Sequence, residues 1–153
     1  MNLGIKDEAF VRGKVPMTKE EIRILTLVKA QIAADAVIYD VGAGTGSLSI
    51  EAARLAPAGH VYAIEKNPEG ISLITENAKH FGVENMTVVE GTAPAAMEGL
   101  PALDVALIGG SGRNLADILD IIGERLRPAG RIVANAITMQ TAAACLDYFH
   151  AHA

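Results

Sequence analysis

The sequence has a single cysteine, no tryptophan and little aromatic or charged character. Cys145 is the only cysteine in 153 residues, so no disulfide forms within the chain. The formal net charge of -5 argues against nucleic-acid binding through a general basic face. The N-terminus lacks a basic start followed by an apolar run, and the longest uncharged run, 132–146, is too short to cross a bilayer. We expect a cytoplasmic protein that binds neither nucleic acid nor a membrane.

Aliphatic residues are what the sequence has in quantity. Hydrophobic residues make up 50% of the chain and charged residues 20%, which excludes a disordered protein. The length suits one domain with a real core. We expect a single domain over 1–153, made of an N-terminal arm (1–17), a leading helix (18–33) and an α/β core (36–150).

Five apolar runs rich in branched residues predict strands, and they alternate with stretches of helical period. The predicted strands are 36–42, 60–65, 86–91, 104–110 and 130–137, and the predicted helices after the first strand are 47–56, 68–82, 114–126 and 139–152. This alternation predicts an α/β fold with a doubly wound, mostly parallel sheet, because parallel strands need crossovers that place helices on both faces.

Helix-end signals agree with this pattern. Asn67 followed by Pro68 indicates an N-cap and a first helical position, and Gly82 indicates the end of the same helix. Thr18 with Glu21 three residues later has the form of a capping box, which predicts the start of the leading helix.

The most informative motif is DVGAGTGS at 40–47, where the first predicted strand meets a helix. Its three glycines, Gly42, Gly44 and Gly46, allow a tight turn and let a ligand approach main-chain N–H groups at the positive end of the helix. Glu65, at the end of the second predicted strand, can accept hydrogen bonds from ribose hydroxyls. The acidic residue favours a nucleotide-like ligand over a simple turn.

Two cofactor types fit this motif. Dinucleotide folds use G-x-G-x-x-G, whose third glycine would fall at position 47, and this chain has Ser47 there. The spacing with Gly46 instead is the one S-adenosylmethionine enzymes use, so we favour S-adenosyl-L-methionine over NAD. At the end of the third predicted strand, Gly91, Thr92 and Ala93 are expected to border the adenine.

Several motifs in order carry a resemblance to one family. The stretches KVPMTKEE, DVGAGTGSLSIEAA, YAIEKNPEGI, VVEGTAP and LIGGSGRNL resemble the CbiT family of cobalt-precorrin-6B C15-methyltransferases, equivalent to the C-terminal half of the precorrin-6Y C5,15-methyltransferase CobL. These enzymes methylate C15 of a precorrin and decarboxylate its C12 acetate. The resemblance implies a class I (Rossmann-like) S-adenosylmethionine-dependent methyltransferase of cobalamin biosynthesis, a precorrin substrate and a homo-oligomer, which by family resemblance is a tetramer.

Carried over to this chain, the resemblance implies a set of cofactor contacts, with Glu65 holding the ribose. The set is Thr18, Gly42, Ala43, Gly44, Thr45, Gly46, Glu65, Gly91, Thr92 and Ala93. The family has Asp where this chain has Thr92. The family also continues into two further strands, so the fold is expected to lack the last two. The strand at 130–137 would then be an open apolar edge, covered by a neighbouring chain unless the sequence is a fragment.

A precorrin is broad, flat and rich in carboxylates, which suggests where it would bind. Cations are expected near it, and the candidates are Arg12, Lys14 and Arg113. The loop of Gly109, Gly110, Ser111 and Gly112 has almost no side chains and would admit a macrocycle. We predict no metal site and assign no catalytic residue. Alternatives are a class I methyltransferase acting on another small molecule, RNA or protein, or a truncated, non-catalytic S-adenosylmethionine-binding domain.

Overall fold

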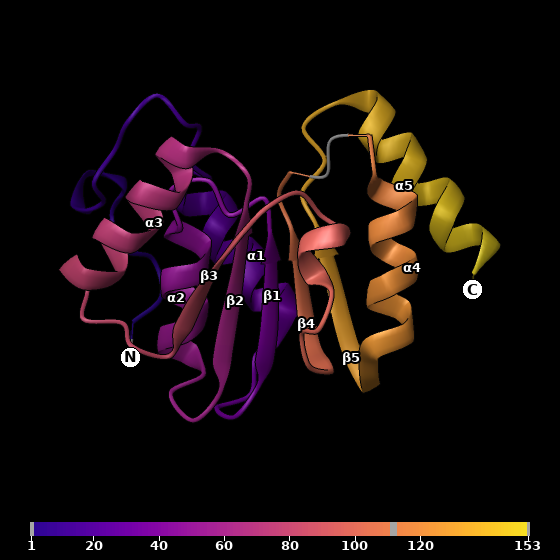
Figure 1. Ribbon diagram of the computed structural model, residues 1–153, viewed down its shortest axis with the longest axis horizontal. Coiled ribbons are helices and arrows are strands. Elements are labelled where there is room, and N and C mark those ends of the chain that lie inside the picture. Colours follow the sequence, from indigo (N-terminus) through magenta and orange to yellow (C-terminus); the bar gives the residue numbers. More distant parts are fainter. Residues whose placement is uncertain (1, 111–112, 153) are drawn as a thin grey trace.

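A computed structural model, which describes residues 2–110 and 113–152, has five parallel strands in one sheet with helices on both faces (Figure 1). The strands are β1 (Val37–Val41), β2 (His60–Glu65), β3 (Met86–Glu90), β4 (Leu103–Ile108) and β5 (Leu126–Ala134). The helices are α1 (Glu20–Ala30), α2 (Ser47–Leu55), α3 (Pro68–His80), α4 (Leu115–Arg125) and α5 (Met139–Ala151), with short 3-10 turns η1 (Asp7–Ala9) and η2 (Ala95–Met97). The strand order β3-β2-β1-β4-β5 confirms the predicted doubly wound sheet.

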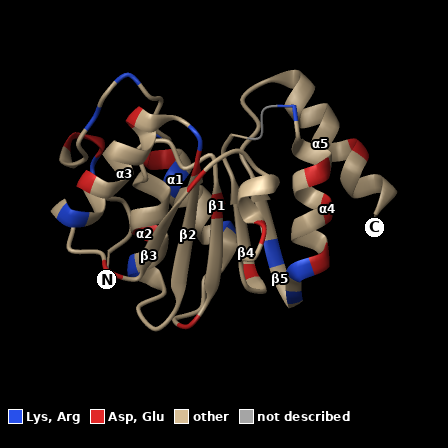
Figure 2. Cartoon of the chain, viewed as in Figure 1, with Lys and Arg blue, Asp and Glu red and all other residues tan. Residues whose placement is uncertain are grey.

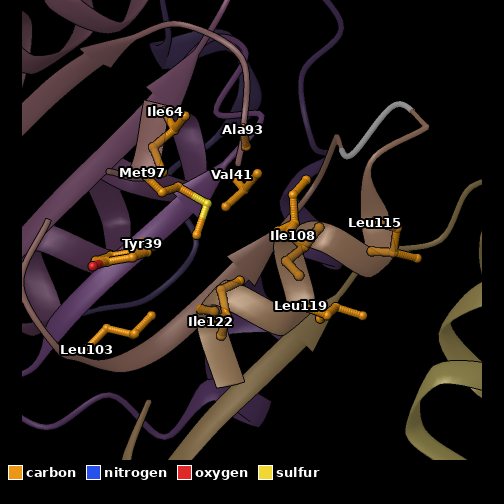
Figure 3. Packing of buried hydrophobic residues seen from close by; sticks show 12 residues of the cluster. Tyr39, Val41, Ile64, Ala93, Met97, Leu103, Ile108, Leu115, Leu119 and Ile122 are labelled. Carbon is orange, nitrogen blue, oxygen red and sulfur yellow. The ribbon is translucent and has the colours of Figure 1, made fainter. Parts of the chain in front are cut away.

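The two faces of the sheet have separate cores because side chains alternate along each strand. On one face, Ile38 of β1 packs with residues of α1 and α2 such as Leu27 and Leu48. On the other, Tyr39 of β1 packs with Met97 of η2 and with α4 (Figure 3). The three inner strands, β1, β2 and β4, are therefore buried on both sides, which explains why they are near-continuous hydrophobic runs in the sequence.

The helix ends predicted around α3 are confirmed. The side chain of Asn67 accepts a hydrogen bond from the N–H of Glu69 at 2.9 Å, with Pro68 at the first helical position. At the other end, Gly82 has a φ of 63°, and the N–H of the following residue, Val83, bonds back to the carbonyl of Ala78 at 2.9 Å. That arrangement is a glycine-terminated helix end, which fixes where the chain leaves α3.

The predicted start of the last strand is wrong. The strand expected over 130–137 runs over Leu126–Ala134, and its first residue already pairs with Leu103 of β4 before the register shifts. The chain then passes through Ala129, whose φ is 65°. This irregularity interrupts the alternating pattern, so the sequence conceals the early start of the strand. As expected, β5 is an edge strand of the described sheet.

The predicted capping box is also wrong, because the buried Arg23 uses the main chain of Thr18 in another way. Helix α1 begins at Glu20 with Lys19 at the N-cap, and no side chain caps it. The Thr18 carbonyl instead accepts a hydrogen bond from Nη1 of Arg23 at 2.6 Å. The N-terminal arm is thus held by a side chain from inside the helix.

Arg23 also connects the arm to α2 through a buried ion pair. Its side chain is 0% exposed, and its Nε lies 2.7 Å from Oε2 of Glu51. Nη1 lies 3.0 Å from Oδ1 of Asp7, and the guanidinium stacks over the ring of Phe10 at 4.8 Å. Glu51 in turn accepts from the N–H of Gly4 at 2.7 Å. These contacts fasten the arm to the rest of the fold.

Asp40 joins β1 to α2 just before the glycine motif. It is 1% exposed, and its carboxylate accepts a hydrogen bond from the hydroxyl of Ser49. Burial raises the pKa of Asp40 to about 6; the charge of Glu65 also raises it, and the Ser49 hydrogen bonds lower it.

No helix in the described part of the chain is long and apolar enough to span a membrane.

We expect Arg23→Met to lower the free energy of unfolding by about 3–5 kcal/mol, because it leaves two carboxylates without their buried cation. Urea unfolding followed by circular dichroism measures the change. Lys6→Met removes the exposed ion pair between Lys6 and Glu20, 3.0 Å apart, and serves as the control with little expected effect. Equal midpoints for the two variants would show that the buried pair does not hold the arm.

The raised pKa of Asp40 predicts a pH dependence of stability. Between about pH 4 and 6 the folded state binds a proton that the unfolded state releases, so the contribution of Asp40 to stability falls as the pH rises and is constant above that window. The difference in unfolding free energy between the native protein and Asp40→Asn should change by up to about 3 kcal/mol over this range. A difference that does not vary between pH 4 and 7 would contradict the prediction.

Candidate functional site

A cleft lies at the carboxyl ends of the strands, where loops from both halves of the sheet meet. Its volume is about 720 Å³, and its walls come from the end of the arm and the start of α1 (15–19), the loop after β1, and the segments that follow the other four strands. Strands β2 and β3 lie to one side of β1, and β4 and β5 lie to the other. The cleft therefore sits at the switch point between β1 and β4, where open α/β sheets bind their ligands.

The glycine motif forms a tight turn at the floor of this cleft. Gly42, Gly44 and Gly46 have φ values of 75°, 60° and 81°, a region that L side chains rarely adopt. A Cβ on Gly42 would also lie 2.6 Å from the backbone nitrogen of Gly110, in the loop after β4. The two glycine-rich loops therefore touch through their backbones. A side chain at position 42 would prevent this contact.

Four backbone N–H groups of this loop have hydrogen-bond partners within the protein. The N–H groups of Gly42 and Ala43 both bond to the carbonyl of Ile64, and that of Gly46 bonds to Ala43. The N–H of Gly44 donates to Oε2 of Glu65 at 2.7 Å.

Glu65 shapes the loop from the end of β2. Besides Gly44, its carboxylate accepts from the backbone N–H groups of Lys66 and Asn67, both at 2.9 Å to Oε1. The side chain is 9% exposed and borders the cleft. Because Oε2 accepts a single hydrogen bond and has a second lone pair, the carboxylate can still receive a ligand hydroxyl.

Helix α3 holds the arm against the same loop. The amide of Asn77, which is 0% exposed, donates to the carbonyls of Thr45 at 2.9 Å and Val11 at 3.1 Å. Its Oδ1 accepts from the N–H of Val11 at 2.8 Å. One buried side chain thus fixes the distance between the arm and the glycine motif, which are far apart in the sequence.

The structure brings together most of the predicted site residues in one cleft. Those that line the cleft are Thr18, Gly42, Ala43, Gly44, Glu65, Gly91, Thr92, Ala93, Gly109, Gly110 and Arg113.

Other predicted residues lie elsewhere. The arm residues Arg12 and Lys14 are exposed and stand outside the cleft lining. Thr45 is 1% exposed, with its hydroxyl 3.4 Å from the N–H of Ser47, and Gly46 packs against α3; neither lines the cleft. The predicted residues 111 and 112, a serine and a glycine, lie outside the described residues.

Sequence reasoning missed several polar residues of the cleft. They are Lys19, Lys66, Asn67, Asn114 and Asn135. Lys66 and Asn67 follow Glu65 directly, so their place beyond a strand end could have been recognised. The place of Asn135 in the cleft could not have been recognised, because Asn135 falls inside the strand predicted over 130–137. In the structure it lies just beyond the end of β5.

A second, smaller cavity of about 210 Å³ adjoins the cleft on the side of α4 and α5. It shares Gly109, Gly110, Asn135 and Ile137 with the main cleft and also contacts Cys145. Burial raises the pKa of the Cys145 thiol, as expected for a packed residue. In the described part of the chain, no three His, Cys, Asp or Glu side chains gather in a way that could hold a metal ion.

Charges at this end of the molecule are mixed. Figure 2 shows Lys and Arg in the loops above the carboxyl ends of the strands, in the arm and beside the segment drawn in grey. Among the described residues that line the cleft, Lys19, Lys66 and Arg113 are cations and Glu65 is the one anion. The cleft is thus positive at its rim although the whole chain is acidic.

Comparison with known proteins identifies the family. A family model described as a precorrin methyltransferase domain matches residues 8–153. A relative from Sulfolobus acidocaldarius, named probable cobalt-precorrin-6B C(15)-methyltransferase (decarboxylating), is 42% identical over 94% of this chain and 76% of its own length. A Salmonella typhimurium protein, named cobalt-precorrin-6B C(15)-methyltransferase (decarboxylating), is 42% identical over 89% of this chain and 70% of its own.

A solved structure agrees with the sequence relatives. The crystal structure of a precorrin-6y C5,15-methyltransferase from Geobacter metallireducens superposes with a TM-score of 0.94 at 41% identity, covering 98% of this chain and 79% of that one. The fold is therefore that of the class I S-adenosylmethionine-dependent methyltransferases, as the glycine motif predicted. This chain belongs to the precorrin methyltransferase domain family.

Proposed function

We propose that this protein is an S-adenosylmethionine-dependent C-methyltransferase of cobalamin biosynthesis, which methylates C15 of a precorrin or cobalt-precorrin and removes carbon dioxide from its C12 acetate. The observation that carries the proposal is 42% identity, over 94% of this chain, to a relative named for that reaction. The cleft at the switch point of the sheet supports it, because the predicted cofactor motif and the loop after β4 line the same cavity.

The cleft residues fit the proposed cofactor, S-adenosyl-L-methionine. Glu65 is a fixed, nearly buried acceptor for the ribose hydroxyls, oriented by three backbone N–H groups. Gly91, Thr92 and Ala93 form a wall of small residues beside which an adenine can lie. Thr18 and Lys19 stand at the N-terminal end of α1, where a carboxylate is stabilised by the helix dipole.

The bound cofactor supplies an electrophilic methyl group on a sulfonium centre. The protein's part is to hold an electron-rich ring carbon in line with that methyl group and to exclude water. A reduced precorrin is nucleophilic through its conjugated pyrroles and can accept the electron pair released when the acetate loses carbon dioxide. Positioning therefore accounts for catalysis without a protein nucleophile.

Substrate binding is assigned to the side of the cleft formed after β4 and β5. Gly109 and Gly110 present bare backbone there, which leaves room for a flat macrocycle. Arg113 borders the cleft, and the neighbouring Asn114 is held by a hydrogen bond from its Nδ2 to the carbonyl of Ala93 at 3.1 Å. A cationic Arg113 suits the peripheral carboxylates of the substrate. Homo-oligomer formation and a cytoplasmic location stay predictions.

Glu65→Gln is expected to weaken binding of S-adenosylhomocysteine by about tenfold to a hundredfold, because it replaces a charged acceptor for the ribose with a neutral amide. Isothermal titration calorimetry gives the dissociation constants. Glu90→Gln is the matched control, since Glu90 pairs in register with Glu65 on the adjacent strand but is exposed and lies outside the cleft lining. An unchanged dissociation constant for S-adenosylhomocysteine in Glu65→Gln would contradict the proposal that this carboxylate binds the ribose.

The proposed reaction is tested by incubating the protein with a precorrin-6B-type substrate and S-adenosylmethionine. Mass spectrometry should show a product that has gained one methyl group and lost carbon dioxide. In the same assay Arg113→Ala should raise KM for the tetrapyrrole about tenfold or more through loss of a carboxylate contact, with S-adenosylhomocysteine affinity unchanged.

Lys79→Ala provides the control for the charge change in Arg113→Ala, because Lys79 is an exposed cation in the last turn of α3 and lies outside the cleft lining.

Tight cofactor binding by the native protein without any product would favour a non-catalytic S-adenosylmethionine-binding domain over the proposed enzyme. Parallel loss of cofactor and substrate binding in Arg113→Ala would contradict the division of the cleft into two halves.

A further inference from the structure

Two large aliphatic side chains of the cleft are exposed to solvent. Ile137, three residues beyond the end of β5, is 92% exposed, and Ile22 in α1 is 46% exposed. Both residues line the main cleft. Single exposed aliphatic residues are common on protein surfaces. Two that border the same cavity are different, because a ligand in the cavity can cover both and remove their apolar area from water.

The two residues belong to the same side of the cleft. Thr26 lies one turn after Ile22 in α1, and its Oγ1 is 3.2 Å from Oδ1 of Asn135, which precedes Ile137 by two residues. Ile137 also lines the smaller cavity together with the bare backbone at 109–110. Ile22 and Ile137 therefore lie where α1 meets the chain leaving β5, next to the glycines that follow β4.

The proposed cofactor half of the cleft has apolar residues of its own. A Cβ on Gly44 of the glycine motif would lie 3.1 Å from the carbonyl oxygen of Pro16 and 3.6 Å from Cγ1 of Val15. These two arm residues therefore adjoin the cofactor loop. Ile137 instead follows β5, which is separated from β1 and its glycine motif by β4, so it lies in the half assigned to the substrate.

Cationic residues border this apolar surface. Lys19 is the N-cap residue of α1, three residues before Ile22, and Arg113 follows the glycines after β4; both line the cleft. An apolar surface with cations at its border suits a ligand that has apolar faces and anionic edges. A precorrin has this form, because its faces are rings and alkyl groups and its carboxylates extend from the periphery.

We propose that Ile22 and Ile137 form an apolar platform on which one face of the tetrapyrrole macrocycle packs, while cations at the border bind its peripheral carboxylates. This inference rests on the proposed function, because it names further substrate contacts in the same cleft. The platform binds the substrate and takes no part in the bond changes. It favours a broad ring over a small acidic substrate, since only a broad ring covers both side chains.

The test measures tetrapyrrole and cofactor affinity separately. Absorbance titration of a precorrin-6B-type tetrapyrrole, with the cofactor site filled by S-adenosylhomocysteine, gives the dissociation constant of the tetrapyrrole. Ile137→Ser should raise it about tenfold and Ile22→Ser about threefold, since protein already covers about half of Ile22. Ile137→Leu, which keeps the apolar volume, should bind like the native protein. The dissociation constant of S-adenosylhomocysteine, from isothermal titration calorimetry, should be unchanged in all three variants.

The chain offers matched controls for both serine variants. Leu25 in α1 is 54% exposed and Met139 at the start of α5 is 88% exposed, and both lie outside the cleft lining. Leu25→Ser and Met139→Ser should therefore keep the native affinity for the tetrapyrrole. Thermal unfolding of every variant shows that it is folded.

Salt separates the apolar contacts from the cationic ones. NaCl screens the cationic contacts, so native binding of the tetrapyrrole should weaken as the salt concentration rises. The ratio of the dissociation constants of Ile137→Ser and the native protein should stay the same. A ratio that falls to one at high salt would overturn the platform, because the substitution would then act through charge.

Other results also decide the matter. Native tetrapyrrole affinity in both Ile22→Ser and Ile137→Ser, or an equal loss of S-adenosylhomocysteine affinity, would overturn the platform. An equal loss of tetrapyrrole affinity in Leu25→Ser, with a lower sedimentation coefficient, would also overturn it, because the exposed face of α1 would then bind a second copy of the chain. A native protein that binds no tetrapyrrole and forms no product would refute the proposed function itself. An active native enzyme with unaffected serine variants would refute the platform alone.

Discussion

The close approach of two backbones, at Gly42 after β1 and Gly110 after β4, is the constraint around which the site is built. The carbonyl of Val41 accepts from the N–H groups of both Gly109 and Gly110, so the pairing of β1 with β4 continues beyond the strand ends. No side chain fits at position 42 without displacing backbone atoms of the second loop. The first loop borders the proposed cofactor and the second the proposed substrate, so their contact fixes the two halves of the cleft relative to each other.

Glu65 fixes the conformation of the glycine loop and also lines the cleft. In a site of this kind the loop N–H groups are the obvious ligand donors, yet here four of them are bonded to Ile64, Ala43 and Glu65. The loop is therefore held in position before any ligand arrives, which reduces the ordering cost of binding.

The arm closes the cleft through buried polar contacts and not through apolar packing alone. Arg23 binds Glu51, Asp7 and the carbonyl of Thr18, and Asn77 binds Val11 and Thr45. A buried arginine that lost these partners would be strongly destabilising, so the arm has few alternative positions. This specificity matters for function, because the end of the arm, with the residues that lead into α1, forms one wall of the cleft at 15–19.

Local patterns in the sequence determined the strand and helix order, the glycine turn, the caps of α3 and the acidic residue at the end of β2, because each depends on neighbours in the chain. Most of the predicted site residues lie in the cleft, since parallel strands bring their carboxyl ends to one edge. Only the tertiary structure decided how groups distant in the sequence satisfy one another. Arg23 takes the carbonyl of Thr18 in place of a capping box, β5 begins early by pairing with β4, and Asn135 meets Thr26 across the sheet edge. These outcomes depend on burial and on which hydrogen-bond partners come within reach, and neither quantity is encoded in a local pattern.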